Sequence, residues 1–247
     1  MPIRENIRSN QELKNILLAD AVLIIAFSMV IAGGIFTLIS SAGSFISVFI
    51  LYLPICAVGV SLSFILHELM HKFVAQHYGA VAGFVTIYNG LLITLVTGAF
   101  GFLLGIPGVT MIYASSFSKK ENGIVSLAGP LTNFAVFGVF CVIFYALNPH
   151  SLLIASQILR PSTYLNAMLS FTVFISLWLA FFNMLPISPL DGSKVLAWSK
   201  PVYLAMLAAV IVLLLLTGII PYVIPWSGII FVLFIALFFS MFYRSIM

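Results

Sequence analysis

The sequence predicts an all-α polytopic membrane protein, with about six transmembrane helices and one membrane-embedded re-entrant or β-hairpin segment around residues 80–115. Of its 247 residues, 63% are hydrophobic and 6% are charged, whereas soluble domains are roughly 45–50% apolar and about 25% charged. Ten basic and six acidic side chains cannot cover the surface of a soluble chain of this size. Lipid is therefore the main solvent of this protein.

The spans follow from the length of the apolar stretches. A bilayer core of about 30 Å requires roughly 20 apolar residues of helix. Six stretches meet or approach that length, at approximately 21–39, 44–66, 124–147, 165–185, 202–218 and 226–243. We expect Asp20 to cap the start of the first span. This span is too long for the core of a signal peptide and should remain as a membrane anchor.

The stretch between residues 79 and 118 is apolar, but glycine and proline interrupt it repeatedly, and β-forming residues occupy 84–88. The number of times this stretch crosses the membrane can be tested with the rule that cytoplasmic loops carry an excess of Lys and Arg. If it crosses the membrane zero times or twice, nine of the ten basic residues fall on one side and only Arg160 falls on the other. This predicts cytoplasmic termini and an embedded hairpin, which is tolerated only where protein or a wet cavity covers the backbone.

The motif His67-Glu68-Leu69-Met70-His71 follows the second span. Residues four apart share one helical face, so both imidazoles can converge on one zinc ion while Glu68 takes a proton from the attacking water. The structural alternative is a pair of buried histidines satisfied by backbone carbonyls. Ionisable residues in membrane segments are costly, which favours the functional interpretation.

A zinc site needs a third protein ligand. His77 has the spacing of the extended motif HExxHxxGxxH, but Val74 replaces its glycine, and in an unbroken helix His77 would lie about 15 Å beyond His67. Asp191 is the better candidate, because it is the remaining acid in an apolar context. It also follows the start of its span by about as many residues as His67 follows the start of the second span, so the two side chains should lie at a similar depth. Alone, Asp191 could equally be a turn or cap residue before Gly192.

Two asparagines are further candidates. Pro186 and Pro189 must interrupt the fourth span, so that Asn183 could hold a substrate backbone or support an oxyanion, or instead form an interhelical hydrogen bond. Residues 128–133, Ala-Gly-Pro-Leu-Thr-Asn, favour close helix packing, with a secondary prediction that Asn133 touches substrate.

Together these motifs resemble the site-2 protease family of intramembrane zinc metalloproteases, whose pattern is HExxH on one core helix and NxxPxxxLDG on another. Residues 67–71 and 183–192 match in that order, and residues 128–133 are similar to the AGPxxN element of the intervening helix. The resemblance covers about 44–192. It implies zinc ligation by His67, His71 and Asp191, with Glu68 as general base and Asn183 as a substrate contact.

The resulting functional hypothesis is hydrolysis of a peptide bond in or near a transmembrane segment of another membrane protein, with one Zn²⁺ per chain. We expect a single domain, 1–247, with an anchor at 1–43, a catalytic core at 44–192 and two spans at 193–247. The alternatives are a zinc- or proton-handling transporter and a catalytically idle scaffold, but the broken segments do not repeat as transporter halves do.

The expected partners are the lipid bilayer and a transmembrane protein substrate. Nucleic-acid binding has little support, because the basic residues form no run or platform. Cys56 and Cys141 lie in apolar runs and are predicted to be packing residues. The absence of a disulfide framework fits a prokaryotic plasma membrane, with the active site toward the cytoplasm.

Overall fold

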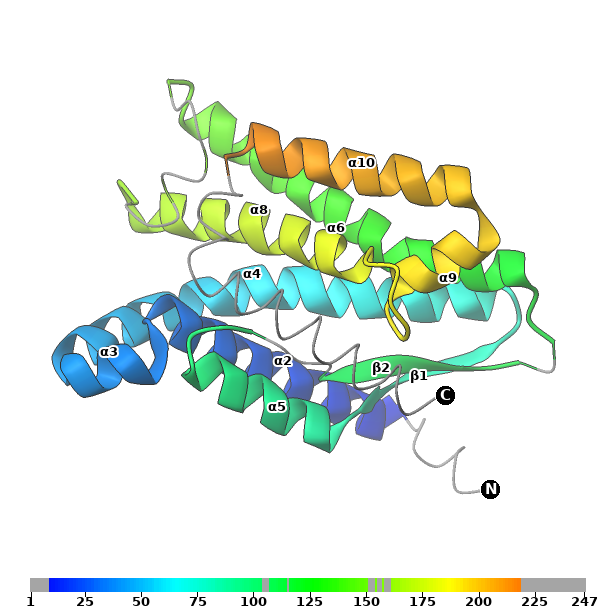
Figure 1. Ribbon diagram of the computed structural model, residues 1–247, viewed down its shortest axis with the longest axis horizontal. Helices are drawn as coiled ribbons and strands as arrows, with labels where there is room; N and C mark the ends of the chain where they lie inside the picture. Colours follow the sequence, from blue (N-terminus) through cyan, green and yellow to red (C-terminus); the bar gives the residue numbers. More distant parts are fainter. Residues whose placement is uncertain are drawn as a thin grey trace, which may run out of the picture.

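The computed structural model describes residues 9–103, 107–114, 116–150, 154, 157 and 161–218. Helices dominate it, and a two-stranded sheet lies beside them (Figure 1). The elements in chain order are α2 (Ser9–Ile31), α3 (Gly34–Ser40), α4 (Ala42–His77), β1 (Val81–Thr86), α5 (Tyr88–Ala99), β2 (Gly108–Tyr113), α6 (Lys119–Leu147), α8 (Tyr164–Asn183), α9 (Asp191–Trp198) and α10 (Lys200–Leu216).

Four helices in the described part of the chain are long and apolar enough to cross a membrane, namely α2, α4, α6 and α8. The predicted number of six spans is therefore supported only in part. α10 falls where the fifth span was predicted, but it has 17 residues. The predicted span at 226–243 lies outside the described residues.

The first span begins and ends earlier than predicted. α2 ends at Ile31 because Gly33 and Gly34 adopt φ values of 86° and 63°, a left-handed conformation that favours glycine and terminates helices. Asp20, expected at the start of the span, lies inside α2. Its carboxylate is buried and accepts a 2.6 Å hydrogen bond from the Ser61 hydroxyl of α4.

Helix α4 is the central element of the bundle. It packs against α2, α6 and α8 (Figure 1), and its 36 residues give a length of about 54 Å. The helix therefore continues past the predicted end at 66 and carries the HExxH motif on the same unbroken rod. α6 also starts before its predicted boundary, because Ser118 and Glu121 form a capping box.

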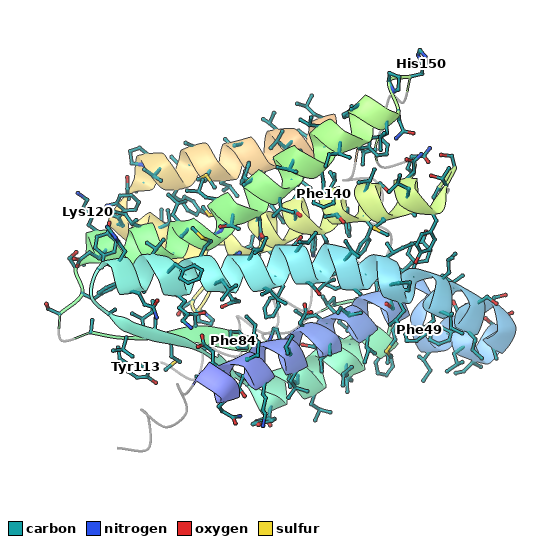
Figure 2. All side chains as sticks on the ribbon, turned by 180° about the vertical axis from the view of Figure 1, so that it is seen from behind. Phe49, Phe84, Tyr113, Lys120, Phe140 and His150 are labelled. Carbon is teal, nitrogen blue, oxygen red and sulfur yellow. The ribbon has the colours of Figure 1, made fainter. Side chains whose placement is uncertain are left out.

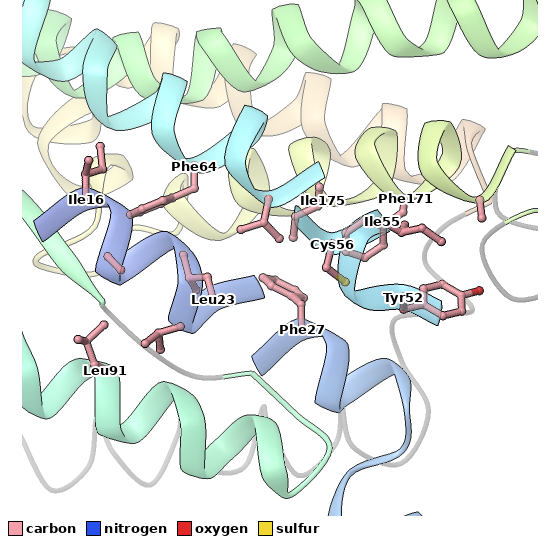
Figure 3. Close-up of a cluster of buried hydrophobic side chains, with 14 of the residues drawn as sticks. Ile16, Leu23, Phe27, Tyr52, Ile55, Cys56, Phe64, Leu91, Phe171 and Ile175 are labelled. Carbon is pink, nitrogen blue, oxygen red and sulfur yellow. The ribbon is translucent and has the colours of Figure 1, made fainter. Parts of the chain in front are cut away.

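The main core lies where α2, α4 and α8 meet (Figure 3). Phe27 of α2 and Phe171 of α8 pack edge to face, with ring centroids 6.3 Å apart. A Cβ at Gly59 would lie 2.8 Å from the Phe171 ring, so glycine permits the close approach of α4 and α8. Cys56 is fully buried in this cluster, as its predicted packing role requires.

The segment predicted as an embedded hairpin has two strands, but a helix joins them. β1 and β2 pair antiparallel, with Phe84 opposite Thr110 and Thr86 opposite Gly108. Between them, α5 packs along α2, and residues 87 and 88 belong to this connection rather than to a strand. The sheet lies beside the C-terminal part of α4 (Figure 1), which brings it next to the HExxH motif.

Large apolar side chains cover the outside of the bundle, and side chains project from the outward faces of the helices along their length (Figure 2). Ile50, Val142 and Leu216 are 63%, 70% and 68% exposed. A soluble monomer rarely exposes so much contiguous apolar surface, whereas lipid covers it at no cost. The described helices are those of a membrane protein.

Candidate metal centre

His67 and His71 lie on one face of α4, one helical turn apart, and both are buried. Their Nε2 atoms are 3.0 Å apart, and the rings stand nearly perpendicular at 88°. This is the arrangement predicted from the spacing of four residues. Both imidazoles present the same ring nitrogen to one point beside the helix.

Asp191 reaches the same point from another element. α8 ends at Asn183, residues 184–190 form a turn that contains the two prolines, and α9 begins at Asp191. The Asp191 Oδ2 atom lies 3.3 Å from Nε2 of His67 and 3.0 Å from Nε2 of His71. The structure thus brings the three predicted ligands together from two distant parts of the chain.

The donor set fits a zinc ion. The three ligand atoms lie within 4.8 Å of one another, and the closest pairs are separated by 3.0–3.3 Å. Ligand atoms placed tetrahedrally around zinc at about 2.0–2.1 Å are about 3.3–3.4 Å apart. Burial raises the pKa of Asp191, but the neighbouring imidazoles of His71 and His67 outweigh it and hold the pKa below its usual range.

Residues of helix α6 contact the Nδ1 atoms of both imidazole rings, on the side opposite Nε2. The Nδ1 atom of His71 lies 2.8 Å from the carbonyl oxygen of Val125, a contact in which Nδ1–H donates and Nε2 keeps its lone pair for a metal. The Nδ1 atom of His67 lies 3.1 Å from the amide of Asn133. Asn133 is completely buried and lines neither of the cavities at the site.

Gly129 gives the imidazoles the space they occupy. A Cβ at this position would lie 2.5 Å from Nε2 of both His67 and His71, closer than real side-chain contacts allow. The small residues at 128–133 were predicted to serve close helix packing. At Gly129, the close approach is to the ring atoms that face Asp191.

Glu68, the predicted base, is half-buried beside the two histidines. Its Oε2 atom accepts a 2.8 Å hydrogen bond from the hydroxyl of Thr110 on β2. Lys194, one turn into α9, places its Nζ 3.8 Å from Asp191 Oδ1, the oxygen that does not face the histidines. Both Glu68 and Lys194 line the cavity that contains the metal centre.

Two adjoining cavities meet at this centre. The first, called the polar cavity here because the charged side chains of the site line it, lies between the three candidate ligands, β2 and the turn before α9. The second cavity is walled mainly by apolar side chains of α2, α4 and α8. Asn183 lines both, as do His67 and Glu68. The Asn183 amide donates to the Leu179 carbonyl at 3.0 Å.

Sequence reasoning missed several residues at the site. Thr110, Val125 and Lys194 had no motif of their own, although Lys194 follows Asp191 by three residues, a spacing that places two side chains on one helical face. His77 lies exposed at the end of α4, and among the described residues it belongs to no group that could hold a metal. The helix runs unbroken from His67 to His77, as expected.

The fold and the site together define a class: a helical membrane protein whose buried histidines and aspartate can hold a metal ion. The sequence pattern of Peptidase family M50 matches residues 55–215, well over half of the chain. The chain belongs to this family, the site-2 proteases, and is a zinc metalloprotease.

Two curated proteins are similar to it. One, from Methanocaldococcus jannaschii, bears the name "Putative zinc metalloprotease" and is 41% identical over 151 residues, which cover 61% of this chain and 73% of that protein. The other, from Bacillus subtilis, is named "Putative zinc metalloprotease YwhC" and is 30% identical over 159 residues, which cover 58% and 68%. No solved structure matches the chain.

Proposed function

We propose that this chain hydrolyses a peptide bond in or near a transmembrane segment of another membrane protein. In this proposal His67, His71 and Asp191 hold one Zn²⁺ per chain and Glu68 is the general base. The observation that carries it is the convergence of three ligand atoms within 4.8 Å, with Glu68 beside them at the junction of a polar and an apolar cavity.

The chemistry divides between the ion and the protein. When bound, Zn²⁺ supplies Lewis acidity for the scissile carbonyl and for the attacking water. Glu68 takes a proton from that water and passes it to the leaving amine. Asn183, on the wall of both cavities, is placed to hold the substrate backbone or its developing negative charge.

Asn133 has a different role in this proposal from the predicted substrate contact. To bind a metal through Nε2, neutral His67 must carry its proton on Nδ1, and the atom facing Nδ1 must then be an acceptor. Rotating the Asn133 amide by half a turn supplies its oxygen, and the two orientations have the same shape. The amide oxygen has no other partner among the described residues, so Asn133 serves His67.

The apolar cavity supports a membrane substrate. Its walls include Leu23 and Phe27 from α2, Phe64 from α4, and Trp178 and Phe182 from α8. These side chains suit an apolar segment rather than a charged peptide. His67 and Glu68 also line this cavity, so a segment lying in it would bring its backbone next to the metal centre.

An extended substrate can pair with β2 but not with the middle of β1. The Phe84 N–H of β1 donates to the buried carboxylate of Glu12 at 3.2 Å, so it points away from β2. Phe84 and its partner Thr110 therefore form a non-hydrogen-bonded pair, and the N–H and C=O of Thr110 face the other edge of β2. In this proposal the extended substrate therefore pairs with the outer edge of β2.

The orientation in the membrane follows from one end of the bundle. The start of α2, the end of α4 and the starts of α6 and α10 lie together there (Figure 1), and Lys72, Lys119 and Lys200 belong to these segments. Lys120 lies at this end of α6 and His150 lies beyond the other end (Figure 2). The basic residues at this end support cytoplasmic termini and a metal centre toward the cytoplasm. We propose residence in a prokaryotic plasma membrane.

The proposal treats residues 1–247 as one domain, with 44–192 as its catalytic core. A shared core cluster supports this, since Ile16, Leu23 and Phe27 of α2 pack in it with residues of α4 and α8. A substrate would thus meet α2 as part of the active-site wall.

The test compares wild type with Glu68→Gln, measuring zinc content and cleavage of a model transmembrane substrate in liposomes. We expect about one zinc per chain in both, with cleavage lowered at least about 100-fold in the variant. Glu121→Gln, at the exposed start of α6, is the control and should cleave normally. Zinc binding without cleavage by wild type would favour transport or a scaffold; absence of zinc would refute the ligand set.

A further inference from the structure

Thr110 touches the predicted base from an element outside the metal-binding helices. Its hydroxyl lies 2.8 Å from Glu68 Oε2 and 3.4 Å from the Glu68 carbonyl oxygen. Among the described residues, no other hydrogen-bond donor reaches the Glu68 carboxylate. Thr110 is itself only 9% exposed, so the protein matrix fixes the position of its hydroxyl.

The contact restrains a side chain that would otherwise rotate. Glu68 is half-buried and projects from α4 into the polar cavity, and a glutamate side chain has several rotamers to lose on ordering. A proton acceptor works only when it is held within hydrogen-bond reach of its donor. The Thr110 hydroxyl holds one carboxylate oxygen and leaves the second free to accept the proton.

The same residue presents its backbone to the substrate side. Because Phe84 and Thr110 form a non-hydrogen-bonded pair, the N–H and C=O of Thr110 point away from β1. The adjoining residues Gly108, Val109 and Ile112 line the polar cavity together with Thr110. A peptide that pairs with this edge therefore meets the strand at the residue that holds the base.

We propose that Thr110 is a positioning residue for Glu68, and that it links the docking of an extended substrate on β2 to the alignment of the base. The inference rests on the proposed peptide hydrolysis and identifies how that site is assembled. Side chain and backbone have separate tasks: the hydroxyl aligns Glu68, and the outward N–H and C=O bind the peptide.

The test replaces Thr110 by Val and by Ser. Thr110→Val keeps the size and the backbone but removes the hydroxyl, so kcat should fall about 10- to 100-fold while KM and zinc content stay within about twofold of wild type. Thr110→Ser restores the hydroxyl and should recover most of kcat. A merely structural role would not produce this separation of kcat from KM with rescue by serine.

The matched control is Thr86→Val. Thr86 is a buried threonine of the same sheet, 8% exposed, whose hydroxyl donates to the Asn15 carbonyl at 3.1 Å. The kcat of Thr86→Val should stay close to that of wild type. An unchanged kcat in Thr110→Val, no recovery in Thr110→Ser, or an equal loss in Thr86→Val would overturn the inference alone. Failure of wild type to cleave would overturn the proposed function and the inference with it.

Discussion

Glu12 Oε2 and Lys72 Nζ lie 2.6 Å apart, which ties the start of α2 to the residue directly after His71, one of the three proposed metal ligands. The other Glu12 oxygen accepts the N–H of Phe84. One buried carboxylate thus joins the start of α2, helix α4 with its HExxH motif, and the sheet. Helix α2 therefore supports the site through these polar contacts of Glu12 as well as through its apolar side chains in the cavity wall.

Glu12→Ala should destabilise the protein by about 3 kcal/mol, since it leaves Lys72 unpaired and the buried Phe84 N–H without its acceptor. The measurement is thermal unfolding in detergent with zinc present. Glu121→Ala, at the exposed N-terminus of α6, is the control and should lower the melting temperature much less. Equal shifts in the two variants would show that the buried carboxylate has no special structural role.

Gly129→Ala should lower zinc affinity at least about 10-fold, because the new Cβ would lie 2.5 Å from both imidazole Nε2 atoms. Gly138→Ala is the matched control on the same helix, since a Cβ there meets nothing within 4 Å. Metal content after dialysis against a chelator series distinguishes them. Zinc retention by Gly129→Ala equal to that of the control would contradict the packing of α6 on the ligands.

Asn133→Leu should weaken zinc binding about 10- to 100-fold, since it removes the partner of His67 Nδ1. Asn133→Asp retains an oxygen acceptor and should bind zinc better than the leucine variant. Asn166→Leu is the control: Asn166 is also buried, but its amide pairs reciprocally with Asn148. That variant should lose stability and keep its zinc affinity; if it loses zinc equally, Asn133 acts only through general stability.

Ile112→Pro should raise KM several-fold and leave zinc content unchanged. Ile112 has the same strand parity as Thr110, so its N–H faces the free edge of β2, and proline is tolerated where the missing donor faces outward. Ile112→Ala keeps the N–H and controls for loss of the side chain. A KM in the proline variant no higher than in the alanine variant would argue against substrate pairing along this edge.

The candidate metal centre was predictable because short-range spacing encodes most of it. His67 and His71 share a helical face whatever surrounds them, and Asp191 stood out as an acid in an apolar segment. The contact between Glu68 and Thr110 joins an α4 residue to a strand that only tertiary packing places there. No local pattern distinguishes Thr110 from the other threonines of the chain.

The errors in the predicted boundaries of the elements also have physical causes. The hydropathy of the first span continues through Gly33 and Gly34, so composition concealed the break that their left-handed conformation makes. Around residues 80–115, the interruption of the apolar sequence by glycine and proline predicted a hairpin. Gly98 instead lies within α5, where a Cβ would come 2.9 Å from the Ala26 backbone, so this glycine permits helix packing.

The length of α4 has a consequence for the surrounding lipid. His67 follows the first residue of α4, Ala42, by about 38 Å of continuous helix, more than the hydrocarbon thickness of about 30 Å. An unbroken helix accommodates such a mismatch by tilting or by deforming the bilayer. We therefore expect the acyl-chain length of the surrounding lipid to change the depth at which the candidate metal centre lies.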